Sequence, residues 1–265
     1  MSKKDDSALR FYNEVLGLER LHYGMWLPED ELSIEKLKEA QVRYEDFLVE
    51  MIPEGVQSVL DVGCGTGALT KKLLSMNYAA EALSPDINQK KVFTESIDAP
   101  FHHSSFEKFE APHKYDCLIM SESAQYIKKR KLFENARNAL NPGGYLMICD
   151  YFVIDTDPQK KHSGHRLEKF MNFIDEYNFE IIYNKDITDD ILNTLRLAKM
   201  TLDKALLALN ILTQKVRKQH RFLSSFVMWL FRKRIAKLMG QIRLLDAEEF
   251  KKNKNYRFLL LQVRN

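Results

Sequence analysis

The order of hydrophobic and polar residues along the chain predicts strands that alternate with helices. Residues 33–52 have a helical pattern, because Ser33 is suited to the N-cap and apolar residues recur from Leu37 to Met51 at helical spacing. Short runs of apolar and β-branched residues follow, each with the length of a buried strand. These runs are residues 58–62, 78–83, 115–120, 144–153, 179–187 and 256–263, with a weaker one at 101–105.

Helical patterns separate several of the predicted strands, notably at residues 131–140 and 165–177. Strands that alternate with helices form parallel sheets covered by helices on both faces. The chain is therefore expected to be an α/β protein with three layers, a sheet between two layers of helices.

One long stretch departs from this alternation. Residues 189–212, 214–239 and 246–253 all have helical patterns, and they separate the strand ending near Ile187 from the last strand. We expect them to form an all-helical lid over the strand ends, inserted before the last strand. The expected domains are an N-terminal helical arm at 1–52, an α/β domain at 53–188 and 254–265, and a lid and substrate-binding insertion at 189–253.

The charge of the chain is unevenly distributed. The formal net charge of the 265 residues is only +3, but residues 214–245 hold nine Lys or Arg and no Asp or Glu. The apolar run at 222–231 within this segment is too short for a bilayer span, which needs about 20 residues. Three alternatives remain: peripheral contact with an anionic membrane through 214–243, a roof over an apolar or acidic substrate, or a packed helix with a solvated basic face.

The composition is typical of a globular protein, with 45% hydrophobic and 29% charged residues. The charged N-terminal segment lacks the apolar core of a secretory signal, so a cytoplasmic location is expected. Cys64, Cys117 and Cys149 fall in predicted strands or the turn after one, as expected of free thiols. No spacing resembles a zinc site, and no metal is expected.

The most informative motif is the turn Asp61-Val-Gly-Cys-Gly-Thr-Gly67. It follows a predicted strand and precedes a predicted helix, beginning at Leu69. Glycines allow a tight turn and a close approach of ligand to backbone, and the helix that follows presents free N–H groups. This arrangement predicts a nucleotide-binding turn.

The segment VLDVGCGTGALT at 59–70 resembles motif I of the class I, Rossmann-like S-adenosylmethionine-dependent methyltransferases. The resemblance covers about residues 56–151, with residues 256–263 matching the family's seventh strand. It implies S-adenosyl-L-methionine as cofactor and a mostly parallel seven-stranded sheet with an antiparallel last hairpin. The implied cofactor contacts in the turn are Asp61, which orients the methionine amino end, and Gly63, Cys64, Gly65 and Gly67.

The ribose site departs from the usual family pattern, because Ala82 stands where an acidic residue closes the second strand. The stretch ALSP at 82–85 instead resembles tocopherol, sterol and cyclopropane-type small-molecule methyltransferases. Ser84 and Asp86 become candidates for the ribose, with Asp86 as a helix cap the alternative. Ser105 and Phe106 are candidates for the adenine, with an ordinary buried Phe the alternative.

The fourth strand ends in Met120-Ser-Glu-Ser-Ala-Gln-Tyr126, which faces the reacting methyl group in the family. The Asn- or Asp-Pro-Pro-aromatic motif of enzymes that methylate bases or glutamine is absent here, which favours a small-molecule acceptor. Ser121 is a candidate cofactor contact. Glu122 could steer an amine or accept a proton, or it could cap the next helix.

The segment Leu21-His-Tyr-Gly-Met-Trp26, with Ala40-Gln41, resembles the N-terminal arm that folds over cofactor and acceptor in tocopherol-type relatives. His22, Tyr23 and Trp26 are therefore candidates for the methyl pocket, because aromatic faces attract a sulfonium. Tyr23 and Trp26 are also counted as cofactor contacts. The alternative is a hydrophobic staple at the start of the helix. The candidate general bases are His22, Tyr23, Glu122, Tyr151 and His165.

The predicted function is methyl transfer to the O, N or C atom of a small, hydrophobic or lipid-like acceptor. Cyclopropane-type methylene transfer to lipid is an alternative that the ALSP stretch permits. A non-catalytic module that uses the basic helix to bind nucleic acid is a third interpretation, which the intact glycine turn disfavours.

Overall fold

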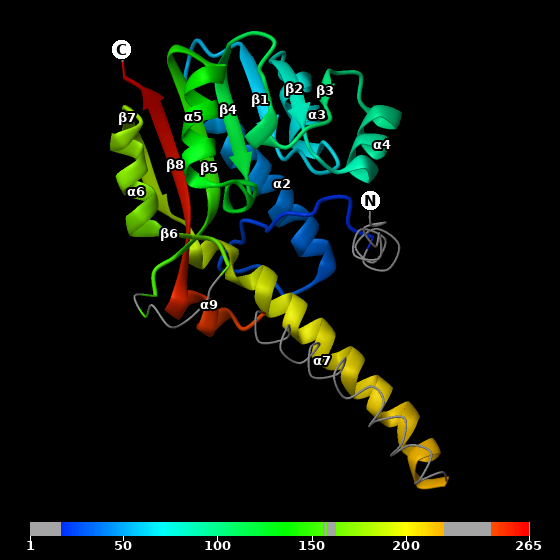
Figure 1. Cartoon of the computed structure of the whole chain (residues 1–265). Coiled ribbons are helices and arrows are strands. Elements are labelled where there is room, and N and C mark those ends of the chain that lie inside the picture. Colours follow the sequence, from blue (N-terminus) through cyan, green and yellow to red (C-terminus); the bar gives the residue numbers. More distant parts are fainter. Residues whose placement is uncertain (1–16, 156, 158–162, 220–244, 265) are drawn as a thin grey trace.

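The computed structural model describes residues 17–155, 157, 163–219 and 245–264 (Figure 1). At its centre lies one sheet with the strand order β3-β2-β1-β4-β5-β8-β7, and β6 pairs with β5 beside this path. The strands are β1 Ser58–Val62, β2 Ala79–Leu83, β3 Phe101–His102, β4 Tyr115–Ser121, β5 Leu140–Val153, β6 His165–Arg166, β7 Phe179–Asp186 and β8 Lys254–Val263. Only β8 runs antiparallel to its neighbours, β5 and β7.

The predicted α/β fold with a mostly parallel sheet is thus confirmed, with the two-residue β6 as an additional eighth strand. The sequence pattern placed residues 165 and 166 in a helix. They instead pair with Phe152 and Val153, and the helix begins only at Leu167.

Helices cover both faces of the sheet (Figure 1). The side chains of α5 and α6 pack in one core with β4 and β5, whereas α2, α3, α9 and the start of α7 share a second core on the opposite face. The helices are α2 Ile34–Glu50, α3 Ala68–Ser75, α4 Ile87–Ser96, α5 Lys129–Ala139, α6 Leu167–Glu176, α7 Thr188–Gln219 and α9 Ala247–Asn253, with 3-10 turns η2 Phe106–Lys108 and η3 Ala124–Tyr126. As predicted, Ser33 caps α2, because its side chain accepts a hydrogen bond from the Lys36 N–H.

The helix α7 differs from its prediction in length. A break was expected near residue 213, but α7 continues to Gln219. Its first turns are buried against the sheet through Ile191 and Leu195, whereas Leu207 and Ile211 are exposed and the helix extends away from the sheet (Figure 1). Residues 220–244, which hold most of the basic apolar segment, lie outside the described residues, so its predicted roles stay predictions.

Within the described ranges, we find no helix that is both long and apolar enough for a membrane span. The three cysteines are buried free thiols, as the sequence predicted.

The segment 17–33 forms an arm that crosses from the glycine turn to α7. The Met25 N–H donates to the Ala40 carbonyl on α2, and the Trp26 N–H donates to the Asp190 carbonyl on α7. At its other end, the Thr66 hydroxyl donates to the Glu19 carbonyl. The arm is therefore held by three separate elements around the carboxyl ends of the parallel strands.

Candidate active site

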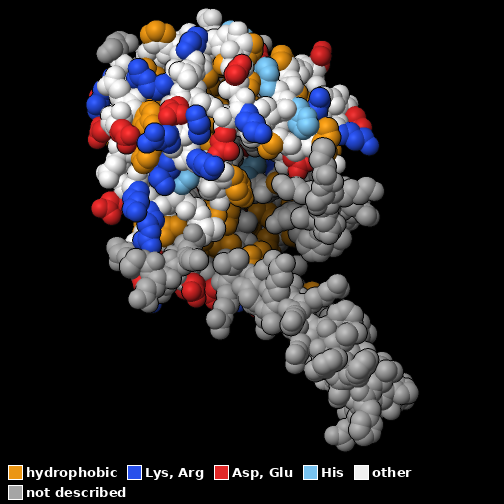
Figure 2. All heavy atoms as spheres, viewed as in Figure 1, with side chains coloured by type: hydrophobic (Ala, Val, Ile, Leu, Met, Phe, Trp, Pro, Cys, Tyr) orange, Lys and Arg blue, Asp and Glu red, His pale blue; other side chains and the backbone are white. Residues whose placement is uncertain are grey.

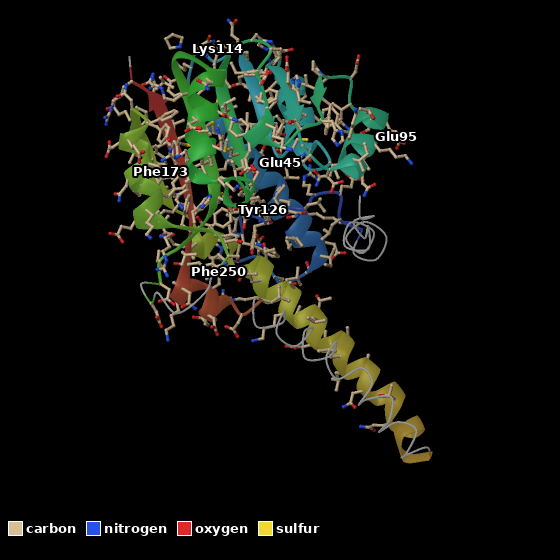
Figure 3. All side chains as sticks on the ribbon, in the orientation of Figure 1. Glu45, Glu95, Lys114, Tyr126, Phe173 and Phe250 are labelled. Carbon is tan, nitrogen blue, oxygen red and sulfur yellow. The ribbon has the colours of Figure 1, made fainter. Side chains whose placement is uncertain are left out.

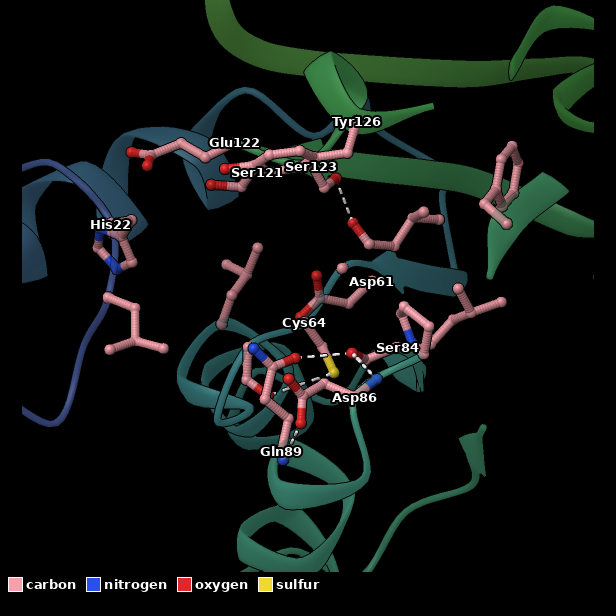
Figure 4. A pocket seen from close by; sticks show the side chains of 18 of the residues that line it. His22, Asp61, Cys64, Ser84, Asp86, Gln89, Ser121, Glu122, Ser123 and Tyr126 are labelled. Atoms are coloured by element: carbon pink, nitrogen blue, oxygen red, sulfur yellow. Dashed lines mark hydrogen bonds between the residues drawn. The ribbon is translucent and has the colours of Figure 1, made fainter. Parts of the chain in front are cut away.

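A pocket of about 560 Å³ lies at the carboxyl ends of β1, β2 and β4, beneath the arm (Figure 4). In open parallel sheets this is the edge where ligands bind, at the point where the strand order reverses. Eleven of the predicted site residues line it: His22, Asp61, Gly63, Cys64, Gly65, Ser84, Asp86, Ser105, Phe106, Ser121 and Glu122.

The glycine turn exposes its main chain to this pocket. Gly65 has a φ of +58°, and a Cβ built there would meet no atom within 4 Å. Gly67, which precedes α3, is different: at its φ of +92° a Cβ would lie 2.4 Å from Ile97 and 2.5 Å from Phe93. Gly67 does not line the pocket, so this glycine allows α3 and α4 to pack closely, whereas Gly65 leaves room for a ligand.

Asp61 is the last residue but one of β1, before the turn, and is only 2% exposed. The Thr70 hydroxyl on α3 donates to its Oδ2 at 2.6 Å, which fixes the carboxylate at the pocket floor. Burial raises the pKa of Asp61 to about 6, against the opposing effect of the Thr70 hydrogen bond. A ligand cation beside Asp61 would favour the ionised form.

The pocket wall after β2 is formed by Ser84, Asp86 and Gln89. The Ser84 hydroxyl donates to Gln89 Oε1 at 2.6 Å and accepts from the Asp86 N–H at 3.2 Å. Asp86 also caps α4, because its Oδ1 accepts from the N–H of Asn88 and of Gln89. Asp86 thus fills the structural role that the sequence offered as an alternative, and it lines the pocket as well.

Ser105 and Phe106 line the far end of the pocket, where η2 begins. Phe106 is 2% exposed and its carbonyl accepts from the Asn135 side-chain amide at 2.6 Å. Both expected adenine contacts therefore lie in one place, held by α5.

Glu122, directly after β4, has an unusual backbone. Its φ of +54° is left-handed, which costs a residue with a side chain about 1–2 kcal/mol. Its Oε1 accepts from the Tyr23 N–H at 2.7 Å and the Tyr256 hydroxyl at 2.9 Å. Burial raises the pKa of Glu122, whereas nearby His22 and the two donors lower it. A strained backbone that holds a half-buried carboxylate at a pocket indicates a functional site.

Two tyrosines that the sequence analysis did not single out support this carboxylate. The Tyr44 hydroxyl lies 2.9 Å from the Tyr256 hydroxyl and 3.0 Å from the Ser121 hydroxyl. Burial raises the pKa of both phenols well above 10, so both stay neutral. A chain of hydroxyl groups therefore links Ser121 to Glu122 through α2 and β8.

A buried carboxylate of α2, outside the pocket lining, holds the arm in place. Glu45 of α2 accepts from Arg20 at both oxygens, 2.7 and 3.2 Å, and lies 3.2 Å from His22 Nε2. The other ring nitrogen, His22 Nδ1, is 2.7 Å from the Tyr23 carbonyl. Both nitrogens of His22 thus face protein oxygens, which suits a residue that positions the arm rather than one that takes a proton from an acceptor. The Gln41 amide donates to the His22 carbonyl at 2.6 Å and reinforces this position.

Two arm residues predicted for the methyl pocket do not line the pocket described above. Trp26 is 4% exposed and packs with Leu18, Leu37 and Leu197, and its Nε1 donates to the Thr194 hydroxyl at 2.9 Å. This packing agrees better with the alternative interpretation of the segment, a hydrophobic staple at the start of the helix, than with a place in the methyl pocket. The ring of Tyr23 packs on Tyr256 and Phe250 behind Glu122.

The remaining base candidates also lie away from the pocket lining. His165 Nε2 is 2.9 Å from the Ala124 carbonyl, and burial lowers its pKa. Tyr151 lies on β5, with its hydroxyl 3.3 Å from that of Ser163.

Arg20, Tyr44, Glu45, Gln89 and Tyr256 are the functional candidates that sequence reasoning missed. Only Gln89 carries a local signal, because it lies three residues after Asp86, in the first turn of α4. The others come together from α2, the arm and β8, so only the tertiary fold brings them near the turn.

Comparison with known proteins supports this interpretation of the pocket. Residues 37–183 match a family described as methyltransferase domain. A Bacillus cereus protein named as an uncharacterized methyltransferase is 26% identical over 129 residues, which is 47% of this chain and 61% of that relative. The chain thus matches less than two thirds of the curated relative's length.

Two solved structures show the same fold. A putative sarcosine dimethylglycine methyltransferase from Galdieria sulphuraria has a TM-score of 0.72 at 19% identity, covering 98% of this chain and 99% of that one. The cyclopropane synthase MmaA2 from Mycobacterium tuberculosis has a TM-score of 0.65 at 14% identity, covering 98% and 94%. With its sheet order, its glycine turn and more than half of its length matched by the family profile, the chain belongs to the methyltransferase-domain family.

Proposed function

We propose that the chain transfers a methyl group from S-adenosyl-L-methionine to a small, apolar acceptor. The observation that carries this proposal is the pocket itself, in which the open main chain at Gly65 and the buried carboxylate of Asp61 lie at one end of a cavity of about 560 Å³. The family membership supports the same activity.

The residues present fit this cofactor. Asp61 offers a carboxylate to the amino group of the methionine part, and Ser84, Asp86 and Gln89 offer oxygen and amide groups to ribose hydroxyls. Ser105 and Phe106 provide a polar and an apolar contact for the adenine. The polar and apolar groups are thus distributed along the pocket as an elongated nucleoside with a charged amino-acid end requires.

When bound, the cofactor supplies an activated methyl group on a sulfonium, which an acceptor takes by in-line displacement. The protein contributes positioning and exclusion of water. The arm closes one side of the pocket through Arg20, Leu21 and His22. Glu122 lies directly after β4, and its Oε1 accepts hydrogen bonds from two donors. Its carboxylate can attract an amine or accept a proton from the acceptor.

The first test measures the affinity of the full chain for S-adenosylhomocysteine by calorimetry. We expect micromolar affinity for the natural sequence and a loss of more than tenfold, about 1.4 kcal/mol or more, for Asp61→Ala. Asp46→Ala is the matched control, because Asp46 is a half-exposed carboxylate paired with Lys72 away from the pocket. No binding by the natural sequence, or equal affinity for Asp61→Ala, would contradict the proposal.

Methylene transfer to a lipid double bond is the second candidate. The carboxylate of Glu122, which lines the pocket, supports it, because that reaction needs an anionic group near the methyl group to receive a proton. The fold shared with a cyclopropane synthase is compatible with it. Both reactions add one CH2 to the product mass, but only methylene transfer consumes a double bond, so hydrogenation of the product followed by mass measurement distinguishes them.

A further inference from the structure

The start of β8 carries a lysine that the proposed function does not use. Lys254 pairs with Val153 of β5, and Tyr256 pairs with Tyr151. Residues two apart in a strand point to the same face, so Lys254 and Tyr256 leave the sheet on one side. The Tyr256 hydroxyl donates a hydrogen bond to Glu122. Lys254 therefore lies on the same face of the sheet as this contact, two residues before Tyr256 and at the start of β8.

A row of aromatic side chains connects Tyr256 with the surroundings of Lys254. The ring of Tyr23 lies 5.5 Å from Tyr256 and 6.5 Å from Phe250, and Phe250 lies 6.0 Å from Tyr151. Tyr23 and Tyr151 are only partly buried, whereas Tyr256 and Phe250 are buried. Figure 2 shows hydrophobic side chains gathered in a hollow on the viewed side of the molecule, and Figure 3 labels Tyr126 and Phe250 at about the same height in that orientation. We call Tyr23, Tyr151, Phe250 and Tyr256 the aromatic wall.

Lys254 stands at the end of the aromatic wall. Its Nζ lies 4.0 Å from the centre of the Tyr151 ring and 5.8 Å from that of Phe250, and it donates to the Ser163 hydroxyl at 3.1 Å. Among the described residues, no carboxylate lies within ion-pair distance of this ammonium.

The surroundings of Lys254 disfavour its charge. Burial lowers the pKa of Lys254 to about 8, and Asp150, on the opposite face of the sheet, only partly offsets this effect. Asp150 itself is held by the N–H groups of Gln125 and Tyr151. A partly buried cation without an ion-pair partner gains most from an anion that enters from outside, because the low-dielectric setting strengthens their attraction.

We propose that the aromatic wall is the acceptor site and that Lys254 and the Ser163 hydroxyl bind a carboxylate at the far end of an apolar acceptor. This inference rests on the proposed function, whose methyl donor lies on the other side of Glu122. One ammonium and one hydroxyl can balance the single charge of a carboxylate and donate to its two oxygens. A phosphate dianion would need additional cations to balance its charge. The acceptor class is therefore an apolar carboxylic acid whose reacting atom lies next to Glu122.

The test uses the full chain saturated with S-adenosylhomocysteine, so that the cofactor pocket is filled. Two acid and alcohol pairs of equal carbon number serve as probes: octanoate with octan-1-ol, and 4-phenylbutanoate with 4-phenylbutan-1-ol. Calorimetry at pH 7 measures the affinity for each. We expect the natural sequence to bind the acid at least fivefold more tightly than the alcohol in at least one pair.

Variants assign this preference to one side chain. Lys254→Met should bind acid and alcohol equally within twofold, and Lys254→Arg should keep the preference. Lys185→Met is the matched control, because Lys185 also comes from a strand of the sheet and lies 5.7 Å from the Phe47 ring, but on exposed β7. It should behave like the natural sequence, and all three variants should keep their affinity for S-adenosylhomocysteine within twofold.

Two results would overturn the inference: equal affinity for acid and alcohol in both pairs with the natural sequence, or a preference that persists in Lys254→Met. If Lys254→Met does not fold, the natural sequence and Lys254→Arg still test the inference. Loss of the preference for acid over alcohol in Lys254→Arg would contradict a role for the positive charge. Failure of the natural sequence to bind S-adenosylhomocysteine would instead contradict the proposed function.

Discussion

At the scale of single residues, the ionisation of Asp61 should make ligand binding in the pocket depend on pH. Its pKa of about 6 belongs to a buried carboxyl group without a bound cation. A cofactor ammonium beside it favours the carboxylate, so binding lowers this pKa. The affinity for S-adenosylhomocysteine should therefore be constant above about pH 7 and fall by up to tenfold per pH unit below pH 6.

Calorimetry between pH 5 and pH 8 checks this pH dependence. Asp61→Asn is the control, because it keeps the shape of the side chain and cannot ionise. Its affinity should be weak and nearly independent of pH over this range. A natural protein that binds equally well at pH 5 and pH 8 would show that the Asp61 charge does not contribute to binding.

The sequence could predict which residues lie together when their positions depend only on neighbours along the chain. Asp61, Gly63, Cys64 and Gly65 could be placed together because a strand, a turn and a helix follow one another directly. It could not predict that Tyr44 and Tyr256, 212 positions apart, share a hydrogen bond. In the sequence both tyrosines fit amphipathic patterns as ordinary core residues, and nothing local marks a buried hydroxyl.

At the scale of elements, Gly67 sets the distance between α3 and α4. Gly67→Ala should lower the free energy of unfolding by about 2–4 kcal/mol, because it combines a left-handed backbone with a Cβ that meets Phe93 and Ile97. Urea unfolding measures this loss. Gly55→Ala is the matched control, since Gly55 has a similar φ of +85° but no atom within 4 Å of a built Cβ.

Gly55→Ala should cost only the backbone part, about 1–2 kcal/mol. The difference between the two variants then isolates the contact between the helices. Equal losses in Gly67→Ala and Gly55→Ala would mean that α3 and α4 adjust without cost to the added methyl group.

Element types were predicted well, and element ends less well. The strand at 58–62 agrees at both ends, because a glycine turn follows it directly. The helix α7 passes the expected break near residue 213, since Thr213 and Gln214 are no stronger helix breakers than their neighbours. The strand β6 carries no pattern of its own, because two residues are too few for a periodicity.

At the scale of the whole molecule, Thr194 joins the arm to α7. Its hydroxyl accepts from the Gly24 N–H at 3.1 Å and from Trp26 Nε1 at 2.9 Å. Thr194→Val keeps the shape and removes this acceptor, which leaves two donors unpaired at a cost of about 1–3 kcal/mol. We expect amide hydrogen exchange in residues 20–26 to become at least tenfold faster and the affinity for S-adenosylhomocysteine to fall severalfold.

Hydrogen exchange with peptide-level resolution checks the arm directly. Thr94→Val is the control, because Thr94 is exposed on α4 and its hydroxyl donates only to carbonyls of its own helix. Unchanged exchange in the arm of Thr194→Val would show that its contacts with α2 are sufficient to hold it over the pocket.

The overall architecture could be predicted because a parallel sheet with alternating helices has few possible arrangements. The lid at 189–253 was predicted only from the length of the helical insertion and from its position before the last strand. The start of α7 contacts the arm, as a cap does, but the rest of the insertion includes residues outside the described ranges, so the lid stays a prediction. The position of Lys254 beside the aromatic wall depends on the antiparallel register of β8, which no local pattern specifies.

The measurement that tests the central claim most directly is a crystal structure of the full chain soaked with S-adenosylhomocysteine. The account predicts density for the ligand along the glycine turn, with its amino group beside Asp61, its adenine at Phe106 and its sulfur toward Glu122. An empty pocket at saturating ligand, or a ligand bound elsewhere on the chain, would contradict it.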